Sequence, residues 1–63
     1  MHDELSTDQA ASLRAVIVQE RRTVAWYTHL LTVTEPGPIE TRLRALRKYH
    51  QAQIKRRKAE LKQ

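Results

Sequence analysis

Apolar side chains recur every three or four residues in two long segments of this chain. In the first segment the series is Ala10, Leu13, Ile17, Val24, Tyr27 and Leu31, and its one gap falls at Glu20. In the second segment the series is Ile39, Leu43, Leu46, Ile54 and Leu61, with gaps at His50 and Arg57. This spacing places the members of each series on one face of an α-helix. The pattern predicts two amphipathic helices.

The segment between the two series contains the residues that interrupt helices. "TEPGP", residues 34–38, holds both prolines and the single glycine of the chain. Upstream, Ser6 and Gln9 have the spacing of a capping box, which starts a helix. Gly37 suits the cap of a second helix, and Pro38 suits its first position because the N–H that proline lacks would be unpaired there. We expect one helical-hairpin domain over 1–63, with helix 1 over about 7–33, a turn over 34–38 and helix 2 over about 38–62.

So short a connection makes the two helices antiparallel neighbours. The predicted fold class is therefore all-α, a two-helix hairpin. Counting back from the turn along both antiparallel helices places Glu20 opposite His50 or its neighbour. It also places the acidic start of the chain, Asp3, Glu4 and Asp8, beside the basic end of helix 2, where part of the charge would be neutralised within the molecule.

Helix 1 carries more apolar surface than one partner helix covers. Four of its side chains lie beside or opposite the apolar stripe: Val18, Trp26, Leu30 and Val33. A monomer of 63 residues buries little of its surface, and the chain has no cysteine for a disulfide or a thiolate zinc site. We expect a homodimer, with two hairpins forming a four-helix bundle whose orientation stays open. Alternatively, these side chains bind another protein with Trp26 as an anchor, or Trp26 only packs on the prolines of the turn.

Charge is distributed unevenly along the chain. Residues 1–20 hold four acidic residues against one arginine, whereas residues 38–63 hold nine lysines and arginines against two glutamates. The net charge of the whole chain is +5. An excess of this kind on one helix favours a polyanionic partner.

Most of the positive side chains of helix 2 fall on its polar side. Arg44, Lys48, Gln51, Lys55, Lys58 and Lys62 form one line, flanked by Arg47 and Arg56. The line extends roughly 27 Å, the length of about eight base pairs. We predict that the residues binding nucleic acid, DNA or RNA, are Arg44, Arg47, Lys48, Lys55, Arg56, Lys58 and Lys62. Tyr49 offers a ring for stacking on a base. The alternative is that these residues form only the solvent-exposed face of the helix and contribute to solubility.

Glu20 and His50 occupy the middle of otherwise apolar stripes. A carboxylate in such a place needs a partner, and the first interpretation is an ion pair that fixes the register of the helices. A pH-responsive switch is a second interpretation. The third is a metal site, since a dimer would gather two glutamates and two histidines. Carboxylate di-iron helices carry Glu-x-x-His, but Arg47 stands three residues before His50, so we expect no metal and no other cofactor.

The remaining features argue against an enzyme and a membrane span. No serine or threonine is spaced with histidine and aspartate in a way that indicates a catalytic triad, and a hairpin forms no cleft to hold one. The apolar runs are much shorter than the roughly 20 residues that cross a bilayer, and the first residues are acidic where a signal peptide would be basic. We expect a cytoplasmic protein that binds nucleic acid in a regulatory or accessory role, or alternatively an adaptor or inhibitor of another protein.

Overall fold

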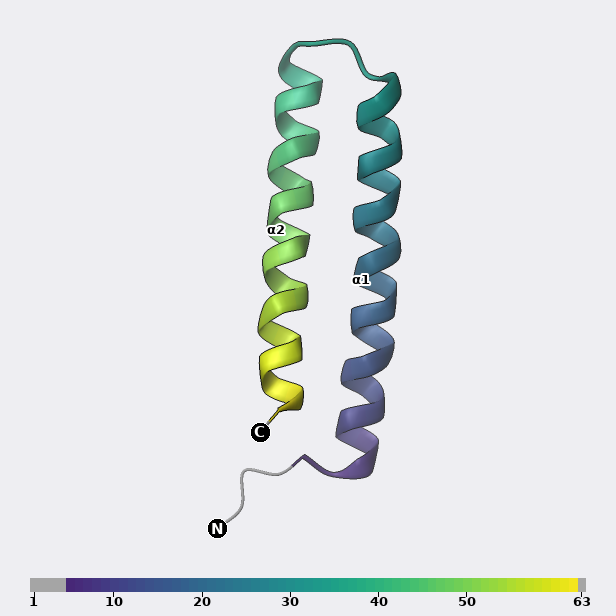
Figure 1. Cartoon of the computed structure of the whole chain (residues 1–63), viewed down its shortest axis with the longest axis vertical. Helices are drawn as coiled ribbons and strands as arrows, with labels where there is room; N and C mark the ends of the chain where they lie inside the picture. Colours follow the sequence, from purple (N-terminus) through teal and green to yellow (C-terminus); the bar gives the residue numbers. More distant parts are fainter. Residues whose placement is uncertain (1–4, 63) are drawn as a thin grey trace.

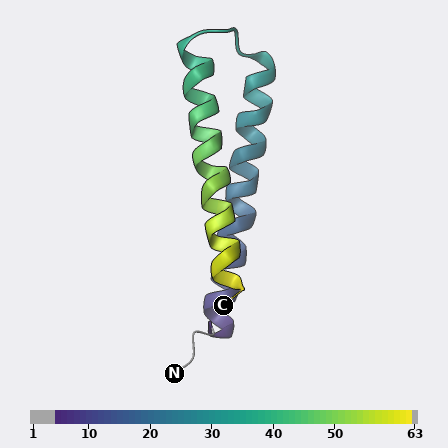
Figure 2. The same cartoon turned by 60° about the vertical axis from the view of Figure 1, so that its left-hand side comes forward.

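The fold is an all-α hairpin, as the sequence predicts. We describe residues 5–62 in a computed structural model of the chain. Helix α1 spans Thr7–Val33 and helix α2 spans Pro38–Leu61. The two helices run antiparallel and stay side by side along their length, with the turn at one end and the start of α1 and the end of α2 at the other (Figure 1, Figure 2).

The start of α1 is fixed by its cap. The Ser6 hydroxyl accepts a hydrogen bond of 3.1 Å from the backbone N–H of Gln9, and the Gln9 side chain accepts one of 2.9 Å from the backbone N–H of Ser6. The predicted capping box is therefore confirmed. It satisfies two N–H groups that the first turn of a helix leaves without an intrahelical partner.

The turn between the helices depends on Gly37. At the end of α1, the Thr34 hydroxyl donates a hydrogen bond of 2.6 Å to the carbonyl oxygen of Leu30. Gly37 caps α2 with a φ of 152°, a conformation that residues with a Cβ rarely adopt. Pro38 follows at the first helical position. Only residues 34–37 therefore separate the helices, one residue fewer than the predicted turn, because Pro38 is already helical.

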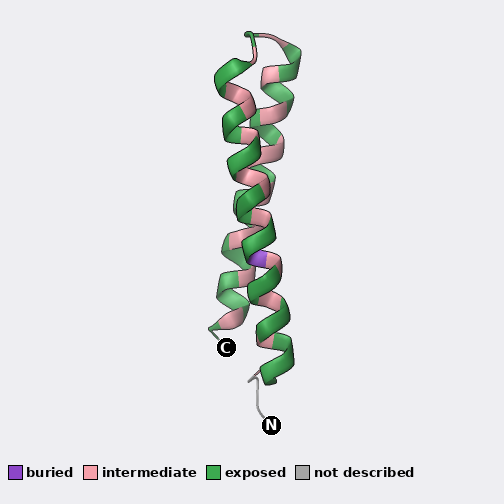
Figure 3. Cartoon of the chain, turned by 90° about the vertical axis from the view of Figure 1, so that its right-hand side faces the viewer, coloured by how far each residue is buried: buried purple, intermediate pink, exposed green. Residues whose placement is uncertain are grey.

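The interface between the helices is narrow. Residues of intermediate burial line the sides of α1 and α2 that face each other, whereas the outer sides are exposed (Figure 3). Ile17, at 5% exposure, is the one buried hydrophobic residue in the described part of the chain. Within residues 5–62, neither helix has both the length and the apolar character to cross a membrane.

Candidate functional site: a cationic flank and a half-buried acid

Glu20 lies in the middle of the helix interface, and α2 supplies a partner for each of its carboxylate oxygens. Oε2 lies 3.1 Å from Nδ1 of His50, and Oε1 accepts a hydrogen bond of 2.7 Å from Nε of Arg57. The Glu20 side chain is only 14% exposed. The hydrogen bond with His50, together with that from Arg57, lowers the pKa of Glu20 below its ordinary value.

The structure brings Glu20 and His50 together, as the sequence predicts, and adds Arg57. The apolar series of helix 2 identifies Arg57 only as a gap and does not predict that it pairs with Glu20. The signal for that pairing is spacing, because Arg57 follows His50 by seven residues and so lies on the same face of α2. His50 also contacts two aromatic rings, Tyr27 at 5.7 Å and Tyr49 at 5.3 Å between ring centroids.

The geometry around Glu20 is that of a structural ion pair. Both carboxylate oxygens already have protein partners, and one of these is a permanently charged guanidinium. Among residues 5–62, no three histidine, cysteine, aspartate or glutamate side chains lie close enough together to hold a metal ion. The arrangement fixes the register of the helices at its centre.

One flank of the hairpin gathers cations from both helices. Arg14 and Arg21 of α1 and Lys58 of α2 line a groove whose other lining residues are Ile17, Val18 and Leu61. Further along the same flank, Arg47 donates a hydrogen bond of 3.3 Å to the Thr28 hydroxyl. We call the side defined by Arg14, Arg21, Arg47 and Lys58 the cationic flank.

Helical spacing extends the cationic flank along α2. Lys55 and Lys62 precede and follow Lys58 by three and four residues, so they are its neighbours on the helix surface. Both are exposed, as are Lys48 and Arg44. Arg44 is also 3.2 Å from Glu40 one turn away, which offsets part of its charge.

Two of the predicted nucleic-acid residues differ from the others. Arg47 is half-buried because it reaches across to α1. Arg56 is exposed but lies on the side of α2 that carries Tyr49 and Glu60, away from the exposed lysines. It follows Tyr49 by seven residues and precedes Glu60 by four. Tyr49 itself is nine residues, or two and a half turns, from Lys58, so its ring lies on the opposite side of α2 from the cationic groove.

Sequence reasoning missed Arg14 and Arg21. Each lies off the apolar stripe of α1, and the two are seven residues apart in the sequence. Their seven-residue spacing, continued by Thr28, places them on one line of the helix. That line faces α2 only once the rotation of the two helices is known, which is why the pattern of α1 alone did not identify them.

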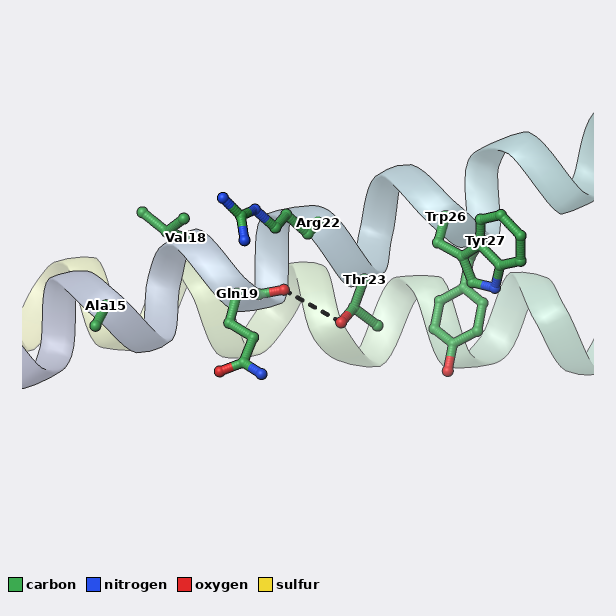
Figure 4. Close-up of a pocket in the computed structure, with 7 residues that line it drawn as sticks. All are labelled: Ala15, Val18, Gln19, Arg22, Thr23, Trp26 and Tyr27. Carbon is green, nitrogen blue, oxygen red and sulfur yellow. Dashed lines mark hydrogen bonds between the residues drawn. The ribbon is translucent and has the colours of Figure 1, made fainter.

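The opposite flank holds the two exposed aromatic residues of the described chain, Trp26 and Tyr49, together with Arg22 of α1 and Arg42 and Arg56 of α2. An open groove along α1 is lined by Ala15, Val18, Gln19, Arg22, Thr23, Trp26 and Tyr27, with Ala15 near one end and Trp26 near the other (Figure 4). Toward the termini a second hollow is lined by Asp8 and Ser12 of α1 and Glu60 of α2, together with Leu5, Gln9 and Leu13. We call the side that carries Ala15, Gln19, Trp26 and Tyr49 the apolar flank.

The predicted protein-binding residues of α1 divide between exposed and half-buried positions. Val18, Trp26 and Val33 are exposed, and Leu30 is half-buried toward the helix interface. The Trp26 ring stacks on His29, with centroids 5.7 Å apart. In the described part of the chain, the hollow at the turn is lined by residues 34–39, and Trp26 is not among them.

The sequence predicts that acidic residues at the start of the chain neutralise the basic end of helix 2, and the structure describes one of the three acidic residues, Asp8. Asp3 and Glu4 lie outside the described residues. Asp8 lines the same terminal hollow as the acidic Glu60 of α2, and no lysine or arginine is in the lining of that hollow.

No protein-family model matches the chain, and neither curated proteins nor solved structures show a significant similarity to it.

Proposed function

We propose that the protein binds nucleic acid through its cationic flank. The observation that carries this proposal is the groove in which Arg14, Arg21 and Lys58 converge from two helices without an acidic residue in its lining. A row of lysines on one helix is a common solubility feature. Cations from two helices around one groove concentrate positive potential at one place, which is what a phosphate backbone requires.

The contacts expected from this flank are with phosphates. Lysine is a compact point charge, and Arg14 and Arg21 stand at the edge of an open groove with no acidic partner in its lining to fix their orientation. Such groups neutralise phosphates but carry little information about the base sequence. The binding should therefore tolerate many sequences and weaken steeply as salt is added.

The length of the flank suits a short stretch of duplex or a folded RNA. From Lys48 to Lys62 the exposed lysines span roughly 21 Å of helix, the rise of about six base pairs. Nucleic acid is available in the cytoplasm, the location that the sequence predicts, and a small binder of this kind would act as a regulatory or accessory factor.

Fluorescence anisotropy with a labelled random-sequence DNA duplex and a labelled RNA hairpin tests the proposal. The informative variant combines Arg14→Gln, Arg21→Gln and Lys58→Gln. Its matched control combines Arg22→Gln, Arg42→Gln and Arg56→Gln, which removes the same charge from exposed positions outside the cationic groove. Circular dichroism establishes that both variants keep their helicity.

We expect the groove variant to lose more than about tenfold in affinity. The slope of its log association constant against log salt concentration should become less steep by about 2 to 3. The control variant should lose much less. Equal losses in the two variants would show that only the net charge matters, which contradicts a site on the cationic flank. Absence of binding by the wild-type protein at low salt would refute the proposed function.

A further inference from the structure

We propose that the apolar flank binds a second copy of this chain, in antiparallel orientation, with each Trp26 placed on the partner's Ala15. The flank exposes aromatic side chains of the kind that protein interfaces bury. Trp26 and Tyr49 are each 57% exposed, although large aromatic side chains are among the most favourable groups to bury. The single hairpin meanwhile buries only Ile17 among its described hydrophobic residues.

Charge decides which flank is available for self-association. An interface between identical chains related by a two-fold axis brings the same surface together from both copies. If the cationic flank were used, Arg14, Arg21 and Lys58 would face the same three residues of the second copy, and like charges would repel. The apolar flank also carries arginines, but Arg22 is the one cation in the lining of its groove, whereas Arg42 and Arg56 lie 14 residues apart on α2. Its use leaves both cationic flanks facing outward.

The charges at the end of the rod decide the orientation. Asp8 and Glu60 line one hollow near the termini. If two hairpins paired with their turns at the same end, these four carboxylates would be brought together. The antiparallel pairing moves the acidic ends apart, so it is favoured.

The groove on α1 is complementary to itself in this orientation. It runs from the small side chain of Ala15 to the large side chain of Trp26, with Gln19 between them (Figure 4). When two α1 helices cross in opposite directions about a point midway between Gln19 and Arg22, each indole lies where the partner's Ala15 leaves room. Small residues opposite large ones allow helices to interdigitate at normal packing density.

The flank is long enough for extended contact between two copies. Helices α1 and α2 have 27 and 24 residues, so the flank runs along about 36 to 40 Å of helix. Two hairpins joined in this way form a four-helix bundle in which neighbouring helices are antiparallel.

Sedimentation equilibrium of the full chain tests the proposal. The wild-type protein should have twice the 7.4 kDa mass of the chain and dissociate on dilution. Dilution should also move the fluorescence emission of Trp26, the single tryptophan, to longer wavelength as its ring becomes exposed. The Trp26→Ala and Ala15→Glu variants should raise the dissociation constant at least about tenfold, while Arg21→Ala on the cationic flank should leave it unchanged.

Cross-linking separates the proposed arrangement from other dimers. The chain has no cysteine, so a single introduced cysteine reports on one position. Under oxidation, Gln19→Cys should form a disulfide-linked dimer because the position lies next to the two-fold axis, whereas Arg21→Cys should not. A helical wild-type monomer at all concentrations, including one that binds some other protein, would overturn the proposal. A dimer that Gln19→Cys fails to link would overturn its geometry.

Discussion

The Nε atom of Arg57 donates a hydrogen bond of 2.7 Å to Oε1 of Glu20 across the helix interface. Oε2 of the same carboxylate lies 3.1 Å from Nδ1 of His50. The acid of α1 thus lies between two side chains of α2 that are one heptad apart. These contacts of Glu20 fix the relative position of the two helices, whose apolar interface is narrow.

Removal of the charge on Glu20 should destabilise the hairpin. Glu20→Gln leaves the half-buried Arg57 without its anionic partner, and we expect the free energy of unfolding in urea to fall by about 1 to 3 kcal/mol. Glu40→Gln is the matched control, because Glu40 pairs with the exposed Arg44 one turn away on the same helix. That change should cost less than about 0.5 kcal/mol. Similar losses in the two variants would contradict a special role for Glu20.

Acid should remove the contribution of Glu20 to stability. Its hydrogen bonds with His50 and Arg57 lower its pKa in the folded state below the ordinary value of 4.5. The folded state therefore binds the proton less readily than the unfolded state does. The contribution is complete above pH 4.5 and is lost as the pH falls through the lowered folded-state pKa.

Urea unfolding at a series of pH values measures this dependence. The stability difference between the wild-type protein and Glu20→Gln should shrink steadily as the pH falls below the ordinary pKa of glutamic acid. A difference that stays constant through this range would mean that the pKa of Glu20 is the same in the folded and unfolded states.

Ile17 should be the most sensitive apolar position. It is the one buried hydrophobic residue among those described, and Ile17→Ala should cost about 2 to 5 kcal/mol, enough to unfold much of so small a protein at room temperature. Ile39→Ala removes the same atoms from a side chain that is 69% exposed, so its effect should be close to zero. Thermal unfolding followed by circular dichroism compares the two, and equal losses would mean that the core lies elsewhere.

A side chain at position 37 should strain the turn. Gly37 has a φ of 152°, and an added Cβ would have no neighbouring atom within 4 Å, so any cost of Gly37→Ala comes from the backbone conformation alone. We expect a loss of about 1 to 3 kcal/mol. Pro36→Ala, in the same turn, serves as the control and should change the melting temperature much less. An unchanged melting temperature for Gly37→Ala would show that the turn tolerates another backbone conformation.

Local chemistry made much of the fold predictable. The capping box at Ser6 and Gln9, the helix-starting Pro38 and the glycine in the turn each act within a few residues, so their effects follow from the sequence alone. The pairing of Glu20 with His50 followed from a short turn and a regular helical rise. The role of Arg57 did not, because it lies one heptad beyond the expected partner and joins Glu20 only through its long side chain.

The sequence by itself determined two amphipathic helices, the turn that joins them and the excess of positive charge on the second helix. Only the tertiary structure decided how the two helices are rotated about their axes, and hence which outer residues share a side. That rotation joins Arg14 and Arg21 to Lys58 on one flank and leaves Trp26 on the other. The physical reason is that helical periodicity fixes angles within one helix, whereas the angle between two helices is set by how their side chains pack at the interface.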